Sequence, residues 1–440
     1  MMQPEKTQAS SQSPKQMLTP HIAGWFCNTN HSFDAETNIQ AMQQAINTSL
    51  PMEQLCADHY ACASTNSISH EQSCITAITG YPRWTESTFA KAAIEKSHAY
   101  ALSLAYHQYG SKFIEHLNGA FSFAIIDTDT NQLLAGVDRL GQFPLYYTKI
   151  DDGIIFGSSV STILAHTTIP RSVQEQGIYD YLYFHMVPSP HSIYKDIKKL
   201  PAGHWLNYAN DSVQISNYYQ PIFNEMAPNS FEEMGKQLKR ELKDAVSHCY
   251  EPTLKTAAFL SGGLDSSTVA GMLSEVSETR AEAYSIGFSA EGYDEMAFAR
   301  ITAKHFGVKL NEYYVTPEDV VDALPIVAAS YDEPFGNSSA LPAYFCAKVA
   351  AENGVERLLA GDGGDELFGG NERYVKQDIF EAYGKIPNGF RKAMIEPIIN
   401  KLPSALPLSS KARSYIEQAN IPLPDRLQTY NFLHQHNPSE

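Results

Sequence analysis

One short stretch constrains the fold of this chain more than any other. The apolar run Thr256 to Leu260 predicts a buried strand, and Ser266 to Leu273 predicts the first turns of a helix. Between them lies Ser261-Gly262-Gly263, which allows backbone torsions that a side chain would forbid. A strand, a glycine loop and a helix N-terminus form a cradle for an anion, because amides and hydroxyls direct their donors inward. Asp265 inside this cradle would repel phosphate unless a divalent cation lay between them.

The heptapeptide at 261–267 is not a Walker motif, which requires the pattern Gly-x-x-x-x-Gly-Lys-Ser/Thr and therefore a lysine. The order Ser-Gly-Gly-Leu-Asp-Ser-Ser instead resembles the PP-loop of the ATP pyrophosphatases, which holds the pyrophosphate part of ATP. An ordinary strand-to-helix turn with two glycines is the alternative. The PP-loop interpretation is favoured because the whole heptapeptide matches.

Bulk composition excludes several classes of protein. The chain has 440 residues, enough for two or three domains, and its net charge of −17 argues against a nucleic-acid groove or an anionic membrane as the general partner. Six cysteines without a Cys-x-x-Cys pair fit buried thiols in a reducing compartment. No stretch is long and apolar enough to cross a bilayer. We therefore expect a cytoplasmic protein.

The first half of the chain predicts antiparallel β-structure. Residues 1–19 are polar and predict a disordered lead, and a short strand is expected from His21 to Cys27. Closely spaced β-rich runs between 117 and 159 indicate stacked antiparallel sheets. The pattern is weak over 28–110. A helix is expected over 174–183, and a loop punctuated by proline and glycine covers 193–204.

A domain junction is expected near 220–235, where prolines and asparagines interrupt the apolar pattern. This division gives an N-terminal domain over 20–220 and a C-terminal domain over 230–440. After a helix at 231–248, strands and helices alternate, which predicts a doubly wound parallel sheet with its ligand at the carboxyl ends of the strands. The expected strands are 283–288, 311–315 and 356–360, and the expected helices are 294–306, 317–330 and 339–352.

A second glycine-rich loop, Gly361–Gly370, directly follows the strand expected at 356–360. Its glycines let the backbone approach a ligand closely, and its acids supply the oxygen ligands that Mg²⁺ prefers. Together with Asp265 this loop would complete a metal-bridged clamp on a triphosphate. An acidic surface turn is the alternative. A third element, Tyr331–Pro342, predicts a loop that ends in a helix cap and forms a wall of an acceptor pocket.

Three motifs together resemble the synthetase domain of the asparagine synthetases and of their relatives, the β-lactam synthetases and lasso-peptide cyclases. They are, in chain order, Ser261–Ser267, Asp332–Phe335 and Gly361–Gly370. The N-terminal half resembles the family's class II glutamine amidotransferase domain. The resemblance covers most of residues 20–375. It implies an N-terminal antiparallel β-sandwich of the Ntn-hydrolase type before the PP-loop domain. The N-terminal matches are Ile22-Ala23-Gly24, Asn118–Asp127, Asp138–Tyr147 and Leu200–His204.

The resemblance also implies roles for individual residues. Asp265 and Asp365 would bind Mg²⁺, and Asp362 and Asp332 would face the acceptor. The reaction implied is attack of a carboxylate on the α-phosphate of ATP, followed by attack of nitrogen on the acyl-adenylate. By the same resemblance, ATP would be bound by Leu260, Ser261, Gly262, Gly263, Asp265, Ser266, Ser267, Ile286, Gly287 and Gly361.

The N-terminal domain departs from the family pattern where glutamine would be hydrolysed. The family's nucleophile is a cysteine at the mature N-terminus, and its position here is Pro20. The glutamine-binding loop of the family is replaced by Thr79–Trp84. Cys27 lies inside an expected strand without a free amine beside it, so we interpret it as a buried structural thiol. We therefore expect an inactive glutaminase and a reaction that uses ammonia or another amine.

The C-terminal end departs as well. Fuller members of the family continue into a helical tail that carries a lysine near the reacting phosphate, and this sequence stops at Glu440 without that segment. We expect a C-terminally truncated synthetase domain. Arg373 and Lys376 follow the second glycine loop and could supply charge, although solvated surface residues are the simpler interpretation.

Three functions remain open from the sequence. The first is an asparagine synthetase that joins aspartate and ammonia with ATP. The second is a relative that amidates or cyclises another carboxylate. The third is a non-catalytic ATP-binding homologue. The resemblance also suggests a homodimer, whereas the net charge of −17 argues against a nucleic-acid partner and a membrane partner.

Overall fold

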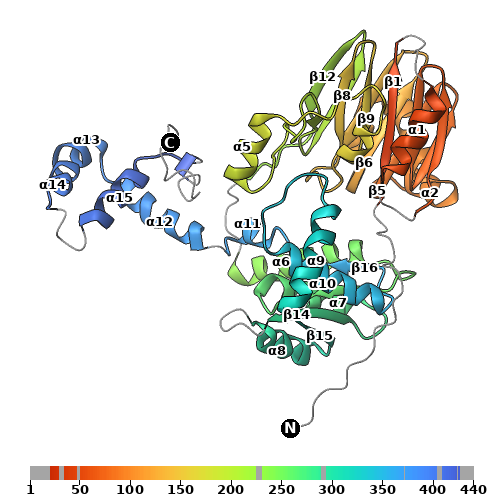
Figure 1. Ribbon diagram of the computed structural model, residues 1–440. Coiled ribbons are helices and arrows are strands. Elements are labelled where there is room, and N and C mark those ends of the chain that lie inside the picture. Colours follow the sequence, from red (N-terminus) through yellow and green to blue (C-terminus); the bar gives the residue numbers. More distant parts are fainter. Residues whose placement is uncertain are drawn as a thin grey trace. The chain divides into compact units, whose positions relative to one another are not determined.

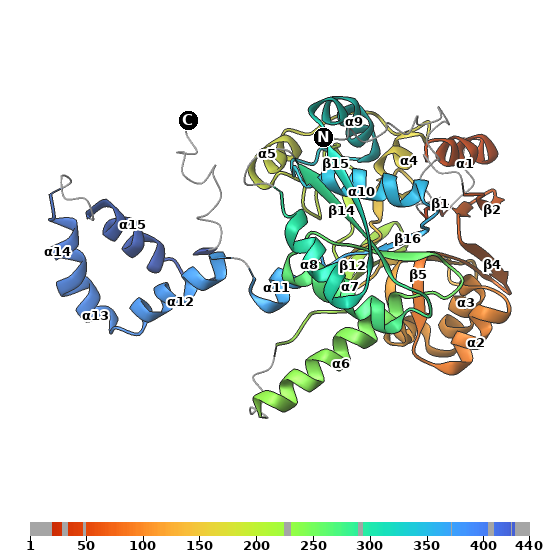
Figure 2. The ribbon, with the colours of Figure 1, turned by 90° about the horizontal axis from the view of Figure 1, so that it is seen from below.

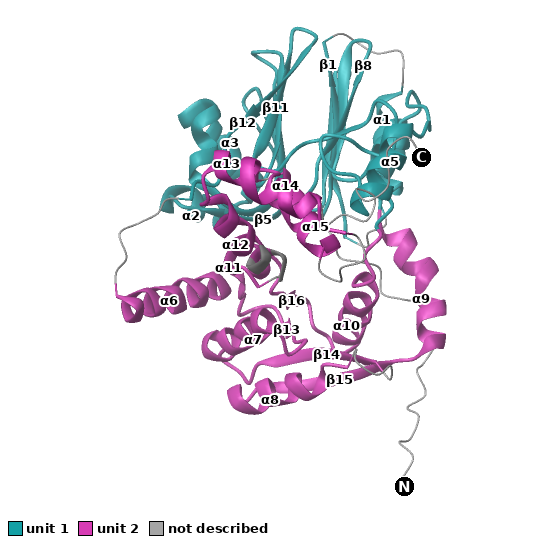
Figure 3. Cartoon of the chain, turned by 90° about the vertical axis from the view of Figure 1, so that its left-hand side faces the viewer, with its two compact units in different colours: residues 1–224, 332–335 teal, residues 225–331, 336–440 magenta. Residues whose placement is uncertain are grey.

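The computed structural model describes residues 20–28, 34–46, 50–223, 230–288, 294–370, 372–403, 409–423 and 425–426. The expected lead at 1–19, part of the expected junction at 220–235 and the side chains of Arg373 and Lys376 lie outside this description. The chain divides into two compact units, shown in Figure 3. Unit 1 contains residues 1–224 and 332–335, and unit 2 contains residues 225–331 and 336–440.

Unit 1 is built on two six-stranded sheets whose pairings are all antiparallel. The first sheet has the order β10 (Lys198–Lys199), β8 (Tyr146–Ile150), β9 (Gly153–Gly157), β1 (Ile22–Cys27), β3 (Tyr60–Ser64) and β2 (Glu53–Ala57). The second has the order β12 (Ser212–Asn217), β11 (His204–Ala209), β7 (Gln132–Val137), β6 (Leu117–Asp127), β5 (Cys74–Trp84) and β4 (Ser67–Glu71).

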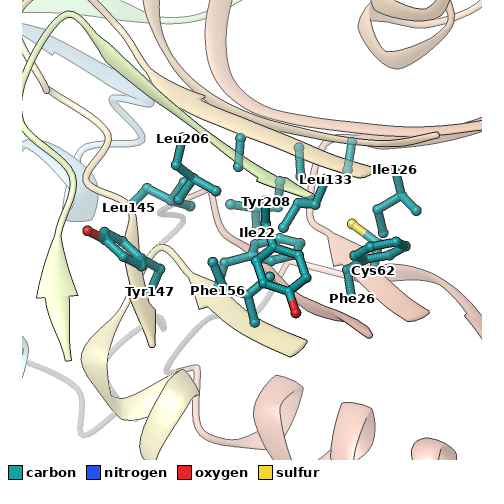
Figure 4. Close-up of a cluster of buried hydrophobic side chains, with 14 of the residues drawn as sticks. Ile22, Phe26, Cys62, Ile126, Leu133, Leu145, Tyr147, Phe156, Leu206 and Tyr208 are labelled. Carbon is teal, nitrogen blue, oxygen red and sulfur yellow. The ribbon is translucent and has the colours of Figure 1, made fainter. Parts of the chain in front are cut away.

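The main core of unit 1 contains buried side chains from both sheets (Figure 4). Phe26 and Phe156 come from the first sheet, and Leu133, Leu206 and Tyr208 come from the second. This packing requires one apolar residue in two along each strand, because successive side chains point to opposite faces. The arrangement confirms the expected stacked antiparallel sheets.

Helices cover the outer faces of these sheets, and unit 1 thereby has two further cores besides the main one. Trp25 and Cys27 of β1 pack in a cluster with residues of α1 (Ala35–Gln44) and α4 (Val160–Leu164). Phe123 of β6 packs in a second cluster, with residues of α2 (Ser87–Glu95), α3 (His98–Tyr109) and the 3₁₀ helix Gly110–His116. Helix α5 (Glu175–Phe184) completes the set, close to the expected 174–183 (Figure 1).

Unit 2 contains a four-stranded parallel sheet with the order β15 (Lys309–Val315), β14 (Glu282–Phe288), β13 (Thr256–Phe259) and β16 (Arg357–Leu359). Neighbouring residues of one strand lie in different cores. Ala258 and Ala283 pack in one cluster, and Ala257 and Tyr284 pack in another. This pattern confirms the doubly wound sheet that the alternation of strands and helices predicts.

Helices lie on both faces of the parallel sheet. The cluster around Ala258 includes α6 (Phe231–Cys249), α7 (Leu264–Val276) and α8 (Met296–Phe306), and α6 lies beside α7 (Figure 2). On the other face, α9 (Pro317–Ser330) packs on α10 (Ala340–Glu352). The helix expected at 317–330 has the predicted bounds.

The remaining helices of unit 2 follow β16. They are α11 (Gly364–Phe368), α12 (Glu372–Gly384), α13 (Asn388–Phe390), a π-helical turn at Arg391–Ile395, α14 (Glu396–Asn400) and α15 (Ser409–Ala419). Phe380, Tyr383 and Ile416 form a small core that joins α12 to α15. Across the described ranges, no helix has the combined length and apolar character that a membrane span requires.

Candidate functional site at the edge of the parallel sheet

Strand order brings the two glycine-rich loops to one edge of the unit 2 sheet. β13 lies between β14 and β16, and all three strands run parallel, so their carboxyl ends share an edge. In chain order, β14 and β15 follow on one side of β13, and β16 comes later on the other side. The carboxyl ends of β13 and β16 therefore flank a topological switch point, where open α/β sheets bind their ligands.

The first loop is held in shape by its own hydroxyl groups. The Ser261 N–H donates to the Ser266 Oγ at 3.2 Å, and the two serine Oγ atoms lie 3.0 Å apart. The Gly263 N–H donates to the Ser261 Oγ at 3.2 Å. Gly262 has a φ of +94°, and a Cβ there would lie 2.6 Å from Cβ of Phe298. The loop thus requires glycine at this position for both torsion and space.

Asp265, in the first turn of α7, lies directly against the second loop. A Cβ on Gly364 would be 2.4 Å from the Asp265 Cγ and 2.5 Å from its Oδ2, and a Cβ on Gly361 would be 2.9 Å from the Asp265 Cβ. The missing side chains are thus what lets the two loops meet. Asp365 is the next residue after Gly364, so the chain places it beside this contact.

The two carboxylates expected to bind a metal are free to do so. Within the described residues, neither Asp265 nor Asp365 accepts a side-chain hydrogen bond, and Asp362 and Asp365 are exposed. Those described residues contain no group of three or more His, Cys, Asp or Glu that could hold a metal ion. Mg²⁺ bound to a nucleotide needs one or two carboxylates in addition to the phosphates, so the donor set fits that ion.

The other residues expected at the nucleotide site lie near the same edge. Leu260 is buried, and its N–H donates to the Tyr284 carbonyl at 2.9 Å. Ile286 is partly buried, and Gly287 lies against the ring of Tyr314. The Ser267 Oγ lies 2.9 Å from the Thr302 Oγ1 of α8, so that hydroxyl already has a partner.

Asp332 is assigned to a different unit from the other acids expected at the site. It belongs to unit 1, whereas Asp265, Asp362 and Asp365 belong to unit 2. Its carboxylate accepts a hydrogen bond from the Ser159 hydroxyl at 2.6 Å. Glu333, the next residue, is the acid that sequence reasoning missed, because its partners lie in distant parts of the chain. No short pattern in the sequence predicts those partners.

The N-terminal unit places non-nucleophilic groups where the resemblance expects a glutaminase. Pro20 is buried, two residues before β1 begins at Ile22. Burial, followed by the charge of Asp152, raises the pKa of the Cys27 thiol to about 12, so it stays protonated and unreactive at neutral pH. Cys27 is fully buried within β1, as expected of a structural thiol. The Thr79 hydroxyl donates to the Asn66 Oδ1 at 3.0 Å and is thereby occupied.

Family models match both units. Residues 237–437 match the model described as asparagine synthase, and residues 89–219 match the model described as a glutamine amidotransferase domain. The first match contains both glycine-rich loops. The second contains most of the second antiparallel sheet.

Individual relatives match across both units. Asparagine synthetase (glutamine-hydrolyzing) 1 of Bacillus subtilis is 28% identical over 327 residues, which cover 74% of this chain and 50% of that protein. Putative asparagine synthetase (glutamine-hydrolyzing) 2 of Methanocaldococcus jannaschii is 32% identical over 321 residues, 71% of this chain and 60% of that protein. Amidase chry2 of Gibberella zeae is 27% identical over 301 residues, which cover 63% of this chain and 43% of that protein. The chain thus spans about half the length of these relatives.

Proposed function

Because the chain belongs to the asparagine synthetase family, we propose that it is an ATP-dependent ligase that forms carbon–nitrogen bonds. A carboxylate oxygen of the acceptor attacks the α-phosphorus of ATP, and the bond to the β-phosphate oxygen breaks to release pyrophosphate. A nitrogen nucleophile then attacks the acyl carbon of the adenylate and loses a proton. The bond to the phosphate oxygen breaks, and AMP leaves.

The observation that carries this proposal is the contact between the two glycine-rich loops. Asp265 lies against Gly361 and Gly364, at the switch point of the parallel sheet. Transfer at phosphorus needs positioning and neutralisation of charge more than it needs a protein nucleophile. The glycine loop carries N–H groups and hydroxyls that can position a phosphate, and a metal ion held by the acidic residues of the second loop would neutralise the charge.

Asp265 and Asp365 would hold Mg²⁺ in this site. The ion would neutralise charge on the triphosphate, which two nearby carboxylates would otherwise repel. To bind the pyrophosphate part, the N–H groups and hydroxyls of Ser261, Gly263 and Ser266 would exchange their hydrogen bonds within the loop for bonds to phosphate oxygens. The exposed carboxylate of Asp362 would face the acceptor.

We propose aspartate as the acceptor and ammonia as the nitrogen donor, which makes the product asparagine. Membership of the family supports aspartate. Pro20 at the position of the glutaminase nucleophile supports ammonia, because proline offers no thiol. Six cysteines without a disulfide fit a reaction in the cytoplasm. A homodimer remains a prediction from the resemblance.

The test is pyrophosphate release with ATP, Mg²⁺ and aspartate, with either ammonium chloride or glutamine as the nitrogen source. We expect release coupled to asparagine formation with ammonium, and at most background with glutamine. Absence of pyrophosphate with ammonium would overturn the aspartate assignment. Efficient use of glutamine would overturn the ammonia assignment.

A second candidate is a relative that amidates or cyclises a different carboxylate. The match to a protein named as an amidase supports it, because the relatives of this chain then include one that is not named an asparagine synthetase. A missing glutaminase also suits an enzyme whose nitrogen comes from its own substrate. Exchange of labelled pyrophosphate into ATP across a panel of carboxylic acids separates the two candidates, since exchange requires the correct acid and no amine.

A further inference from the structure

The segment Asp332–Phe335 belongs to unit 1, although the residues on both sides of it belong to unit 2. It lies in the connection between α9, which ends at Ser330, and α10, which begins at Ala340. The chain therefore leaves unit 2, passes through unit 1 for four residues and returns. The contacts of two consecutive acids in this segment show how unit 1 holds it.

The carboxylate of Glu333 is enclosed and fully used. Its side chain is 8% exposed. Oε1 accepts a hydrogen bond from the Ile193 N–H at 2.8 Å, and Oε2 accepts one from the Tyr146 hydroxyl at 2.8 Å. Oε2 also forms an ion pair with Nζ of Lys199 at 2.5 Å. A buried carboxylate is tolerated when its charge is compensated and its oxygens are hydrogen-bonded, and both conditions hold.

The groups that enclose Glu333 are themselves held in place. Nζ of Lys199 also donates to the Val187 carbonyl at 2.8 Å and lies 5.4 Å from the centroid of the Tyr146 ring. Burial, and then the charge of Glu333, shift the pKa of Tyr146 far above its usual range, so the phenol stays a donor. These donors come from β8, β10 and the loop before β10.

Asp332 is held in the same way by the start of α4. The Ser159 hydroxyl donates to its Oδ1 at 2.6 Å, and Ser159 is the N-cap of α4. Burial raises the pKa of Asp332, while hydrogen bonds from Ser159 and Ser161 act in the opposite direction. Unit 1 thus offers donors from several separate elements to two adjacent acids, and the segment itself occupies this site.

We propose that Asp332 and Glu333 are positioning residues, through which unit 1 holds the loop that leads into α10 for the ligase reaction. The Asn337 side chain accepts from the Ser339 N–H at 3.0 Å and so forms the turn that starts α10. Holding Asp332–Phe335 fixes the start of this turn and of the loop that follows it. Unit 1 thereby has a structural role that needs no glutaminase nucleophile, the residue that Pro20 replaces. The effect on acceptor binding rests on the proposed function, but the holding itself does not.

Two adjacent pairs of residues provide matched variants. Lys199→Met removes the cation that pairs with Glu333, and Lys198→Met changes the neighbouring lysine, whose side chain is exposed. Tyr146→Phe removes one hydroxyl that donates to Glu333. Tyr147→Phe removes a hydroxyl that makes no hydrogen bond within the described residues. The tyrosine variants change one atom each, so they test the proposal even if Lys199→Met does not fold.

Hydrogen exchange of the amides over 331–339 measures the holding directly and needs no activity. We expect exchange there to rise about tenfold in Lys199→Met and by less in Tyr146→Phe, with Lys198→Met and Tyr147→Phe unchanged. The double variant Lys199→Met/Glu333→Gln should exchange more slowly than Lys199→Met alone, because it leaves no buried unpaired charge.

Steady-state kinetics give the second measurement. In Lys199→Met we expect the KM for the acceptor carboxylate to rise about tenfold, with the KM for ATP within about twofold of wild type. Equal amide exchange over 331–339 in Lys199→Met and Lys198→Met would overturn the proposal that unit 1 holds this segment. Raised exchange with an unchanged acceptor KM would overturn the role in the reaction. An inactive wild-type protein with the expected exchange pattern would overturn the proposed function and leave the holding intact.

Discussion

His21 illustrates how burial changes the chemistry of a single side chain in unit 1. Its Nδ1 lies 2.9 Å from the Ser158 Oγ, which also accepts from the Ile22 N–H at 3.1 Å. The serine hydrogen is therefore available to donate to Nδ1, which favours the neutral ring protonated on Nε2. Burial lowers the pKa of His21 from 6.5 to about 4. The folded unit thus keeps a neutral histidine at pH values where the unfolded chain would carry a charged one.

This shift predicts that unit 1 loses stability in acid. Between pH 6.5 and about 4 the unfolded state binds more protons than the folded state, so the free energy of unfolding falls as the pH falls through this window. We expect a loss of about 2 kcal/mol between pH 7 and pH 5 from this residue. The three tryptophans, Trp25, Trp84 and Trp205, all lie in unit 1, so fluorescence during urea unfolding follows this unit.

The control compares two histidine substitutions. His21→Gln should flatten the pH dependence between pH 7 and pH 5, whereas substitution of the exposed His70 by Gln should keep the wild-type slope. If the two variants have the same slope as wild type, burial of His21 does not contribute to acid sensitivity.

Sequence reasoning at the residue level could propose the roles of Asp265 and Gly361, because short motifs directly after strands carry them. The same reasoning could not find the partners of Glu333. Tyr146 and Lys199 are ordinary strand residues in the sequence, and three-dimensional folding alone brings them to one carboxylate. Contacts between distant, individually unremarkable residues leave no local pattern.

At the level of secondary-structure elements, local signals decided what could be predicted. Helix α9 has the predicted bounds because Thr316 caps it in a reciprocal capping box with Asp319, and Pro317 occupies its first turn. The hairpin of β11 and β12 was not predicted. Its turn residues Asn210 and Asp211 both have positive φ, and this Asn-Asp pair is the sequence signal that would have located the turn.

The start of α11 packs against the start of α7, and this contact between elements can be tested at Gly364. A Cβ there would lie 2.4 Å from the Asp265 Cγ, so Gly364→Ala must displace the carboxylate or the loop. We expect Gly364→Ala to weaken binding of Mg²⁺ and ATP by about tenfold. Titration calorimetry measures this loss.

Gly235→Ala is the matched control for Gly364→Ala. Gly235 lies inside α6, where an added Cβ meets no atom within 4 Å. This variant should keep wild-type affinity and gain about 0.5–1 kcal/mol of stability, because alanine favours the helix. Unchanged nucleotide affinity in Gly364→Ala would show that the contact between the loops is not needed for binding.

At the scale of the whole molecule, each unit has its own cores, and the antiparallel and parallel sheets are as the sequence predicts. Alternating apolar residues and alternating strands and helices were sufficient for that prediction. The passage of residues 332–335 through unit 1 was not predictable, because the sequence around them reads as an uninterrupted part of the second domain. We expect function to depend on both units, because we propose that the acidic pair positions the loop into α10.

We propose above all that Asp265 and Asp365 together bind one Mg²⁺-bound nucleotide, and titration calorimetry with α,β-methylene-ATP tests this most directly. This analogue cannot release pyrophosphate, so binding is measured without turnover. With excess Mg²⁺, Asp265→Asn and Asp365→Asn should each weaken binding at least about tenfold, or about 1.4 kcal/mol. Glu275→Gln, an exposed acid on the same helix as Asp265, should bind like wild type. Wild-type affinity in both aspartate variants would contradict the account.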